Sequence, residues 1–145
     1  IYRSLLMKKN LIEMDEFDKN ERNVMNYGHS FGHAIETATN YSIPHGIAVT
    51  IGMDMANYIA VKINQSSDTI FRKMHQVLEK NASEYRNHPI DHELLLAALY
   101  KDKKNTKDKL RLILPDNNGF IGIGVYDKNL SLGLFIQEYL QEFQA

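Results

Sequence analysis

The spacing of apolar residues constrains the fold of this chain more than any other feature. Over most of its length, apolar side chains recur every three or four residues, which is the period of an α-helix with one buried face. Segments with this spacing are residues 1–14, 24–38, 46–63, 69–80, 91–100 and 130–143. The pattern predicts a mainly α domain of five to six helices.

One segment departs from the helical period. Leu110, Leu112 and Leu114 alternate with other side chains, and residues 115–119 read Pro-Asp-Asn-Asn-Gly, which is typical of a turn. Residues 120–125 then read as a returning strand. A two-stranded hairpin is marginally stable alone, so we expect this one to pack on the helices.

The ends of two helices carry their own signals. Asp68 is the expected N-cap of the helix over 69–80, and Asp91 is the expected N-cap of the helix that follows it. Residues 81–89 between these helices are expected to form a loop.

Length and composition exclude several classes of protein. A chain of 145 residues predicts one domain, and zero cysteines exclude a disulfide framework, a thiolate metal site and a cysteine nucleophile. The net charge of −1 gives no global attraction to nucleic acid or to a membrane surface. Without an apolar span or an export leader, we expect a cytoplasmic protein. Because the chain starts at Ile1 within a helical pattern, we also expect it to be a piece of a longer protein.

Histidines and glycines mark the candidate functional segment. His29 and His33 are four residues apart and share one face of a helix, a spacing that suits a divalent metal. Glu36 follows near the same stripe, and a carboxylate can hold the second ring nitrogen of a metal-binding histidine. His45 stands at the start of the next helix, directly after Pro44, where exposed N–H groups favour a polar site.

The spacing alone leaves other interpretations open. Histidine pairs four residues apart are more often surface residues without a metal. Gly28 and Gly32 precede the two histidines, although glycine inside a helix costs about 1 kcal/mol relative to alanine. Close approach of another backbone or a ligand would explain them. Ser30 excludes the H-E-x-x-H motif, and spacing cannot rank the histidines as metal ligand or proton carrier.

The segment resembles 3-dehydroquinate synthase and the wider sugar phosphate cyclase group. The signature of that group runs R-x-x-L-N-x-G-H-[ST]-x-G-H-A-x-E and then H-G-E-A-V-x-x-G-M, and its two parts correspond here to residues 22–36 and 45–53. Arg3, Ser4 and Lys8 resemble the helix before the motif, and residues 101–104 resemble an Asp-Lys-Lys element. The resemblance implies the C-terminal helical metal-binding domain of a two-domain enzyme, whose N-terminal domain binds NAD.

The resemblance also implies roles for individual residues. His29 and His45 are expected to bind zinc or another divalent metal, and His33 is expected to assist proton transfer. Arginine and lysine suit the carboxylate and phosphate of a small sugar phosphate substrate. The expected substrate ligands are Lys8, Arg22, Asn26 and one of the two candidates Lys103 and Lys104.

The implied reaction converts a seven-carbon ketose phosphate acid into 3-dehydroquinate and phosphate. It uses NAD and zinc and is a carbon–oxygen lyase step of the shikimate pathway to aromatic amino acids. NAD would be held mainly by the N-terminal domain, and a homodimer is left open. The isolated chain is expected to be inactive. Three alternatives remain: a cyclitol-forming cyclase, a metal-dependent alcohol or glycerol dehydrogenase, and a non-enzymatic helical module.

The sequence departs from the family pattern at three positions. Ile47 stands where the family commonly has Glu, Asp18 stands where dehydroquinate synthases usually carry Glu, and Met25 replaces Leu. Related cyclases vary around the pocket, so these changes bear on the substrate more than on the fold. The resemblance implies that the third zinc ligand, a Glu, and a nearby catalytic Lys lie upstream of Ile1.

Two remaining features have simpler interpretations. The five lysines of residues 101–109 are typical of a solvated loop, and interspersed Asp residues without aromatics argue against nucleic-acid binding. His75 lies on a charged helix and is expected to be exposed.

Overall fold

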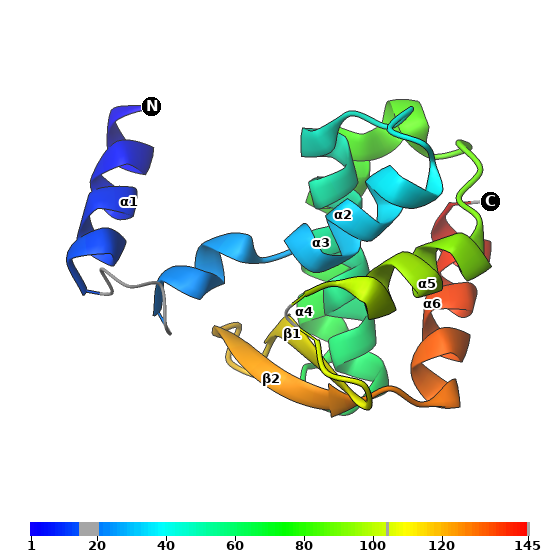
Figure 1. Ribbon diagram of the computed structural model, residues 1–145. Helices are drawn as coiled ribbons and strands as arrows, with labels where there is room; N and C mark the ends of the chain where they lie inside the picture. Colours follow the sequence, from blue (N-terminus) through cyan, green and yellow to red (C-terminus); the bar gives the residue numbers. More distant parts are fainter. Residues whose placement is uncertain (15–20, 104, 145) are drawn as a thin grey trace.

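The computed structural model describes residues 1–14, 21–103 and 105–144 and is mainly helical (Figure 1). Six α-helices and one two-stranded hairpin are found within these segments, as the apolar spacing predicts. The elements are α1 Tyr2–Met14, η1 Glu21–Asn26, α2 His29–Ala38, α3 His45–Lys62, α4 Asp68–Ala82, η2 Ser83–Tyr85, α5 His92–Lys101, β1 Lys109–Pro115, β2 Ile121–Asp127 and α6 Leu130–Phe143. No helix in the described segments is long and apolar enough to cross a membrane.

Side-chain caps explain where α4 and α5 begin. Asp91 Oδ1 accepts a hydrogen bond from the backbone N of Leu94 at 2.8 Å, which confirms Asp91 as an N-cap. The prediction for Asp68 was wrong by one residue. Ser67 is the N-cap of α4, because its hydroxyl oxygen accepts from the backbone N of Ile70 three residues on.

The helix predicted over 24–38 is two elements instead of one. The 3-10 helix η1 ends at Asn26, and α2 begins at His29. Gly28 between them is the N-cap of α2 and has a φ of 78°, a left-handed conformation that cannot continue a right-handed helix. His29 therefore lies at the start of a helix and not inside one.

The hairpin forms where the alternating pattern predicts it. Strands β1 and β2 pair antiparallel, with Lys109 opposite Asp127 at the open end. Leu110, Leu112 and Leu114 are 0%, 1% and 0% exposed, and β1 packs against α3. Burial of this apolar face against a helix supplies the support that an isolated hairpin lacks.

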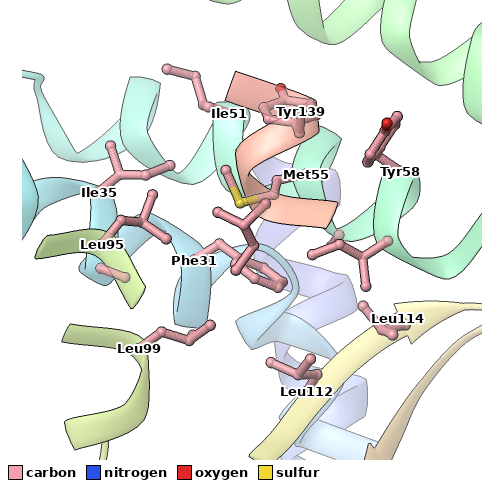
Figure 2. Close-up of a cluster of buried hydrophobic side chains, with 14 of the residues drawn as sticks. Phe31, Ile35, Ile51, Met55, Tyr58, Leu95, Leu99, Leu112, Leu114 and Tyr139 are labelled. Carbon is pink, nitrogen blue, oxygen red and sulfur yellow. The ribbon is translucent and has the colours of Figure 1, made fainter. Parts of the chain in front are cut away.

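The hydrophobic core is built around α3 (Figure 2). Eleven of the eighteen residues of α3 are buried, so this helix is covered on most sides. Phe31 and Ile35 of α2, Leu95 of α5 and Tyr139 of α6 pack in the same core, and each is 2% exposed or less. Because α3 is packed on most sides, the position of its first residue, His45, is fixed by the core.

A buried polar cluster also holds α3 in place. Asp54 of α3 is 3% exposed, and its Oδ2 accepts a hydrogen bond from the Tyr139 hydroxyl at 2.7 Å. His75 Nδ1 of α4 lies 2.7 Å from the same oxygen. The sequence-based expectation that His75 is exposed was wrong: its side chain is 16% exposed, because Asp54 gives it a polar partner inside the core.

The ionisation of Asp54 gives a prediction for stability against pH. Burial raises the pKa of this carboxyl above its ordinary value, while the bonds from Tyr139 and His75 act in the opposite direction. The folded carboxyl therefore holds its proton more tightly than the unfolded one. Above about pH 4 the Asp54 contribution to the free energy of unfolding falls as pH rises, until the raised pKa is passed.

We expect Asp54→Asn to lack this pH-dependent loss. The stability of the variant relative to the wild type should therefore become more favourable as pH rises above about pH 4, until the raised pKa of Asp54 is passed. Urea unfolding of both proteins across this range measures the difference. A difference that stays constant or shrinks with rising pH would contradict the assignment.

Helix α1 stands apart from the other helices (Figure 1). Its main contact is with η1, and none of its residues is buried. Ile1, Tyr2, Leu5 and Met7 of this segment are all more than half exposed. An apolar surface of this kind on one helix is typical of a segment that packs against further protein.

Candidate metal centre

Two helix starts bring three histidines together. His29 is the first residue of α2, His33 lies one turn further along it, and His45 is the first residue of α3. The two helices are consecutive in the chain and pack against each other. The first residues of α2 and α3 therefore lie close together.

Glycines allow the backbones of α2 and α3 to approach closely. A Cβ atom placed on Gly52 would meet the carbonyl O of Gly28 and would lie 2.7 Å from the backbone N of Gly32. A Cβ on Gly28 would lie 2.8 Å from the carbonyl O of Val49, and one on Gly32 would lie 3.0 Å from the Val49 Cα. Contact with another backbone is thus the reason that glycine precedes both histidines.

The three imidazole rings form a nearly equilateral triangle. The ring centroids lie 5.6 Å apart for His29 and His33, 5.6 Å for His29 and His45, and 5.7 Å for His33 and His45. Two imidazoles that share a tetrahedral metal at ordinary bond lengths have centroids about 5 Å apart. The spacing of the rings is therefore close to what a shared ion requires.

Two of the rings have an acceptor beside Nδ1. Nδ1 of His45 lies 3.1 Å from Oε1 of Glu36, and Nδ1 of His29 lies 3.4 Å from the carbonyl oxygen of Tyr27. A carboxylate and a carbonyl can only accept, so both contacts favour the tautomer with the proton on Nδ1. That tautomer leaves the lone pair of Nε2 for a metal, which is the usual support of a metal-bound histidine.

A second group of donors, which includes Glu36 and leaves out His29, could also hold a divalent transition metal. Possible ligand atoms of His33, Glu36 and His45 all lie within 4.8 Å of one another. Glu36 is 8% exposed and so offers a carboxylate in a partly dry environment. Imidazole nitrogen with carboxylate oxygen is a donor combination that zinc and its neighbours in the transition series accept.

An open hollow lies beside His33. Its volume is about 300 Å³, and it is lined by Ser30, His33 and Thr37 of α2 together with Lys103 after α5. Lys103 is exposed, so its ammonium group can meet a charged ligand there. The structure thus brings Lys103 and His33 to one surface, while Lys104 lies outside the described residues.

The other expected substrate ligands are less closely grouped. Asn26 ends η1 and is half-buried, two residues before the left-handed Gly28. Arg22 lies in η1, but its side chain is outside what the structure describes, and so is Asp18. Lys8 is exposed on α1, which stands away from α2 and α3, so the structure does not bring it to the histidines.

The sequence contained no indication of the contact between the Tyr27 carbonyl and His29. It indicated Glu36 as a partner of a histidine but not which histidine. The carbonyl of Tyr27 gave no signal, because every residue has a carbonyl and only the fold aims one at a ring nitrogen. Glu36 stood out as a carboxylate near His29 and His33. Its observed partner is His45, nine residues away, and only the packing of α2 on α3 makes that contact.

The fold and the centre define a helical domain that presents histidines from two adjacent helix starts. The family model described as 3-dehydroquinate synthase C-terminal matches residues 1–105. This chain therefore belongs to the 3-dehydroquinate synthase C-terminal domain family.

Individual relatives agree with this assignment. The 3-dehydroquinate synthase of Dictyoglomus thermophilum is 38% identical over 124 residues, which are 85% of this chain and 35% of that protein. The 3-dehydroquinate synthase of Campylobacter concisus is 37% identical over 121 residues, which are 82% of this chain and 35% of that protein. The chain thus spans about a third of the length of the curated relatives it matches.

Solved structures extend the likeness to the hairpin and α6. A 2-deoxy-scyllo-inosose synthase, solved with carbaglucose-6-phosphate, NAD⁺ and Co²⁺, matches with a TM-score of 0.74 and 25% identity. The match covers 94% of this chain and 39% of that one. A second structure of a 2-deoxy-scyllo-inosose synthase matches with a TM-score of 0.73 and 26% identity, over 90% of this chain and 36% of that one.

Proposed function

We propose that this chain is the metal-binding half of a 3-dehydroquinate synthase. The complete protein would convert a seven-carbon ketose phosphate acid into 3-dehydroquinate and phosphate in the cytoplasm, as a lyase of the shikimate pathway. The observation that supports this most is the triangle of imidazoles, two of which have an acceptor beside Nδ1. An acceptor beside Nδ1 is the usual support of a metal-bound histidine, and the two rings that have one are those of His29 and His45.

His29 and His45 are the proposed metal ligands, with a third ligand supplied from outside this chain. Glu36 holds the Nδ1 proton of His45, and the Tyr27 carbonyl holds that of His29. When bound, the metal supplies Lewis-acid polarisation of substrate oxygens, and NAD, held mainly by the rest of the protein, supplies reversible hydride acceptance. The side chains around the centre position the substrate and move its protons.

The remaining residues are proposed to meet the charged substrate. His33 is exposed and lines the hollow, and its proposed role is to carry a proton. Lys103 at the same hollow would contact a phosphate or carboxylate, and the N-terminal ends of α2 and α3 favour negative charge nearby. Arg22 and Asn26 are proposed to bind the substrate carboxylate, and Lys8 is proposed to act in the complete protein.

A second candidate is a cyclase that makes a cyclitol from a hexose phosphate. The likeness to two 2-deoxy-scyllo-inosose synthase structures favours it, and Ile47, at a position where the family commonly has Glu, bears on which substrate is bound. The identity to those structures is 25% and 26%, against 38% and 37% to 3-dehydroquinate synthases, so we place the ketose phosphate acid first.

The decisive assay measures phosphate release by the complete protein. We expect release from the seven-carbon ketose phosphate acid when NAD and a divalent metal are present, and no release by the isolated chain of 145 residues. In this proposal the isolated chain lacks the third metal ligand and the NAD-binding part. Release only from a hexose phosphate would establish the cyclitol-forming alternative. Turnover by the isolated chain would contradict the proposal that part of the active site lies outside these 145 residues.

A further inference from the structure

We propose that Tyr27 is a positioning residue that, held by Asn57, orients the ring of His29 toward the metal. This inference rests on the proposed function, in which His29 is a metal ligand. It adds two residues, one of them 28 positions along the chain from His29, that act on the centre without touching the metal.

The side chain of Tyr27 is anchored to α3. Tyr27 is 8% exposed, and its hydroxyl donates a hydrogen bond to Oδ1 of Asn57, which is 2% exposed. The same hydroxyl lies 3.3 Å from the carbonyl oxygen of Met53, one turn earlier on α3. The aromatic ring is therefore tied to the central helix of the core through its polar end.

The buried amide of Asn57 has little else to bond with. Its Nδ2 is buried without a hydrogen-bond partner among the residues that the structure describes. A buried polar group with an unsatisfied donor is destabilising, and the bond from Tyr27 to Oδ1 offsets part of that cost. The amide is therefore better explained as the anchor of Tyr27 than as a packing residue.

The main chain transmits this anchor to His29. The backbone N of Tyr27 donates to the carbonyl of Val24 at 3.1 Å, and the carbonyl of Tyr27 lies 3.4 Å from Nδ1 of His29. Gly28 between them is left-handed and is wedged against the backbone of α3. With its side chain, its backbone N and the following Gly28 all held, the Tyr27 carbonyl has a fixed direction.

A carbonyl oxygen held in this direction favours one tautomer of the His29 ring. Because the carbonyl only accepts, it favours the proton on Nδ1 and leaves Nε2 as the metal-binding atom. Loss of the Tyr27 hydroxyl would remove the link to Asn57 and allow the turn to shift. The ring would then lose part of its preference for the metal-binding tautomer and direction.

The test is cobalt binding by the complete protein with Tyr27→Phe. We expect Co²⁺ affinity, measured by competition with a chelator, to fall about tenfold, as is typical when a group supporting a metal ligand is removed. The visible absorption spectrum of the bound Co²⁺ should change as well. Tyr126→Phe is the matched control, because it removes one hydroxyl that donates to Gln65 Oε1 at 2.6 Å on the hairpin, and it should leave both readouts unchanged.

A second variant keeps the test informative if Tyr27→Phe folds poorly. Asn57→Leu removes the acceptor and keeps Tyr27, and it should weaken Co²⁺ binding in the same way. Wild-type affinity and spectrum in either folded variant would overturn the positioning role. His29→Ala separates the two failures: if it leaves Co²⁺ binding intact, the proposed ligand itself is wrong, and if it abolishes binding while Tyr27→Phe does not weaken it, only the positioning role is wrong.

Discussion

Replacement of Gly52 by alanine is expected to lower the free energy of unfolding of this domain by about 3 kcal/mol or more. The added methyl group would meet the carbonyl O of Gly28 and would lie 2.7 Å from the backbone N of Gly32. Neither backbone atom can rotate away as a flexible side chain can, so α2 and α3 must separate. Separation would also move His29 away from His45, so metal retention should fall together with the melting temperature.

Gly46→Ala on the same helix is the matched control. No atom lies within 4 Å of a Cβ placed there, so the new methyl group meets only open space. Alanine is the better helix former by about 1 kcal/mol, so Gly46→Ala should be neutral or slightly stabilising. Thermal unfolding of both variants of the complete protein checks the pair. Equal melting temperatures would show that α2 and α3 do not need their close contact.

The second large effect is expected on metal content. His29→Ala and His45→Ala should each weaken zinc binding by more than about 100-fold, beyond the loss typical of a supporting group. His33→Ala should retain the metal and lose turnover by about 10²–10⁴-fold, the usual contribution of a proton carrier. Metal analysis and a phosphate-release assay on the same three preparations separate these outcomes.

His88→Ala is the control for a histidine outside the centre. Its Nε2 lies 2.8 Å from the hydroxyl of Ser42, and the ring has no part in the triangle. We expect this variant to keep both metal and activity. Metal loss in His33→Ala with full retention in His29→Ala would reverse the assignment of ligand and proton carrier.

Most of the fold could be predicted because its signals are local. The apolar spacing located the helices, and the Leu110, Leu112 and Leu114 alternation located the hairpin. The errors occurred where a nonlocal contact or a single backbone angle decides. Gly28 interrupts a helical pattern through its left-handed conformation, and His75 is largely shielded from solvent because Asp54, 21 residues away, offers it a carboxylate.

The candidate site could be predicted as a set of residues but not as an arrangement. The motif identified His29, His33 and His45, and the structure brings all three rings together. The contacts of Glu36 with His45 and of Tyr27 with His29 depend on how the turn at Gly28 packs on α3. Lys8 shows the opposite case, because a residue assigned by resemblance alone lies on a helix that stands apart from the centre in this chain.

The central claim is that His29 and His45 share one divalent ion. Anomalous X-ray diffraction from crystals of the complete protein, collected at the zinc absorption edge, tests it most directly. We predict one peak within about 2.0–2.1 Å of Nε2 of both rings, with a third ligand from outside these 145 residues. A peak held by His33, Glu36 and His45 with His29 turned away, or no peak near the triangle, would contradict the claim.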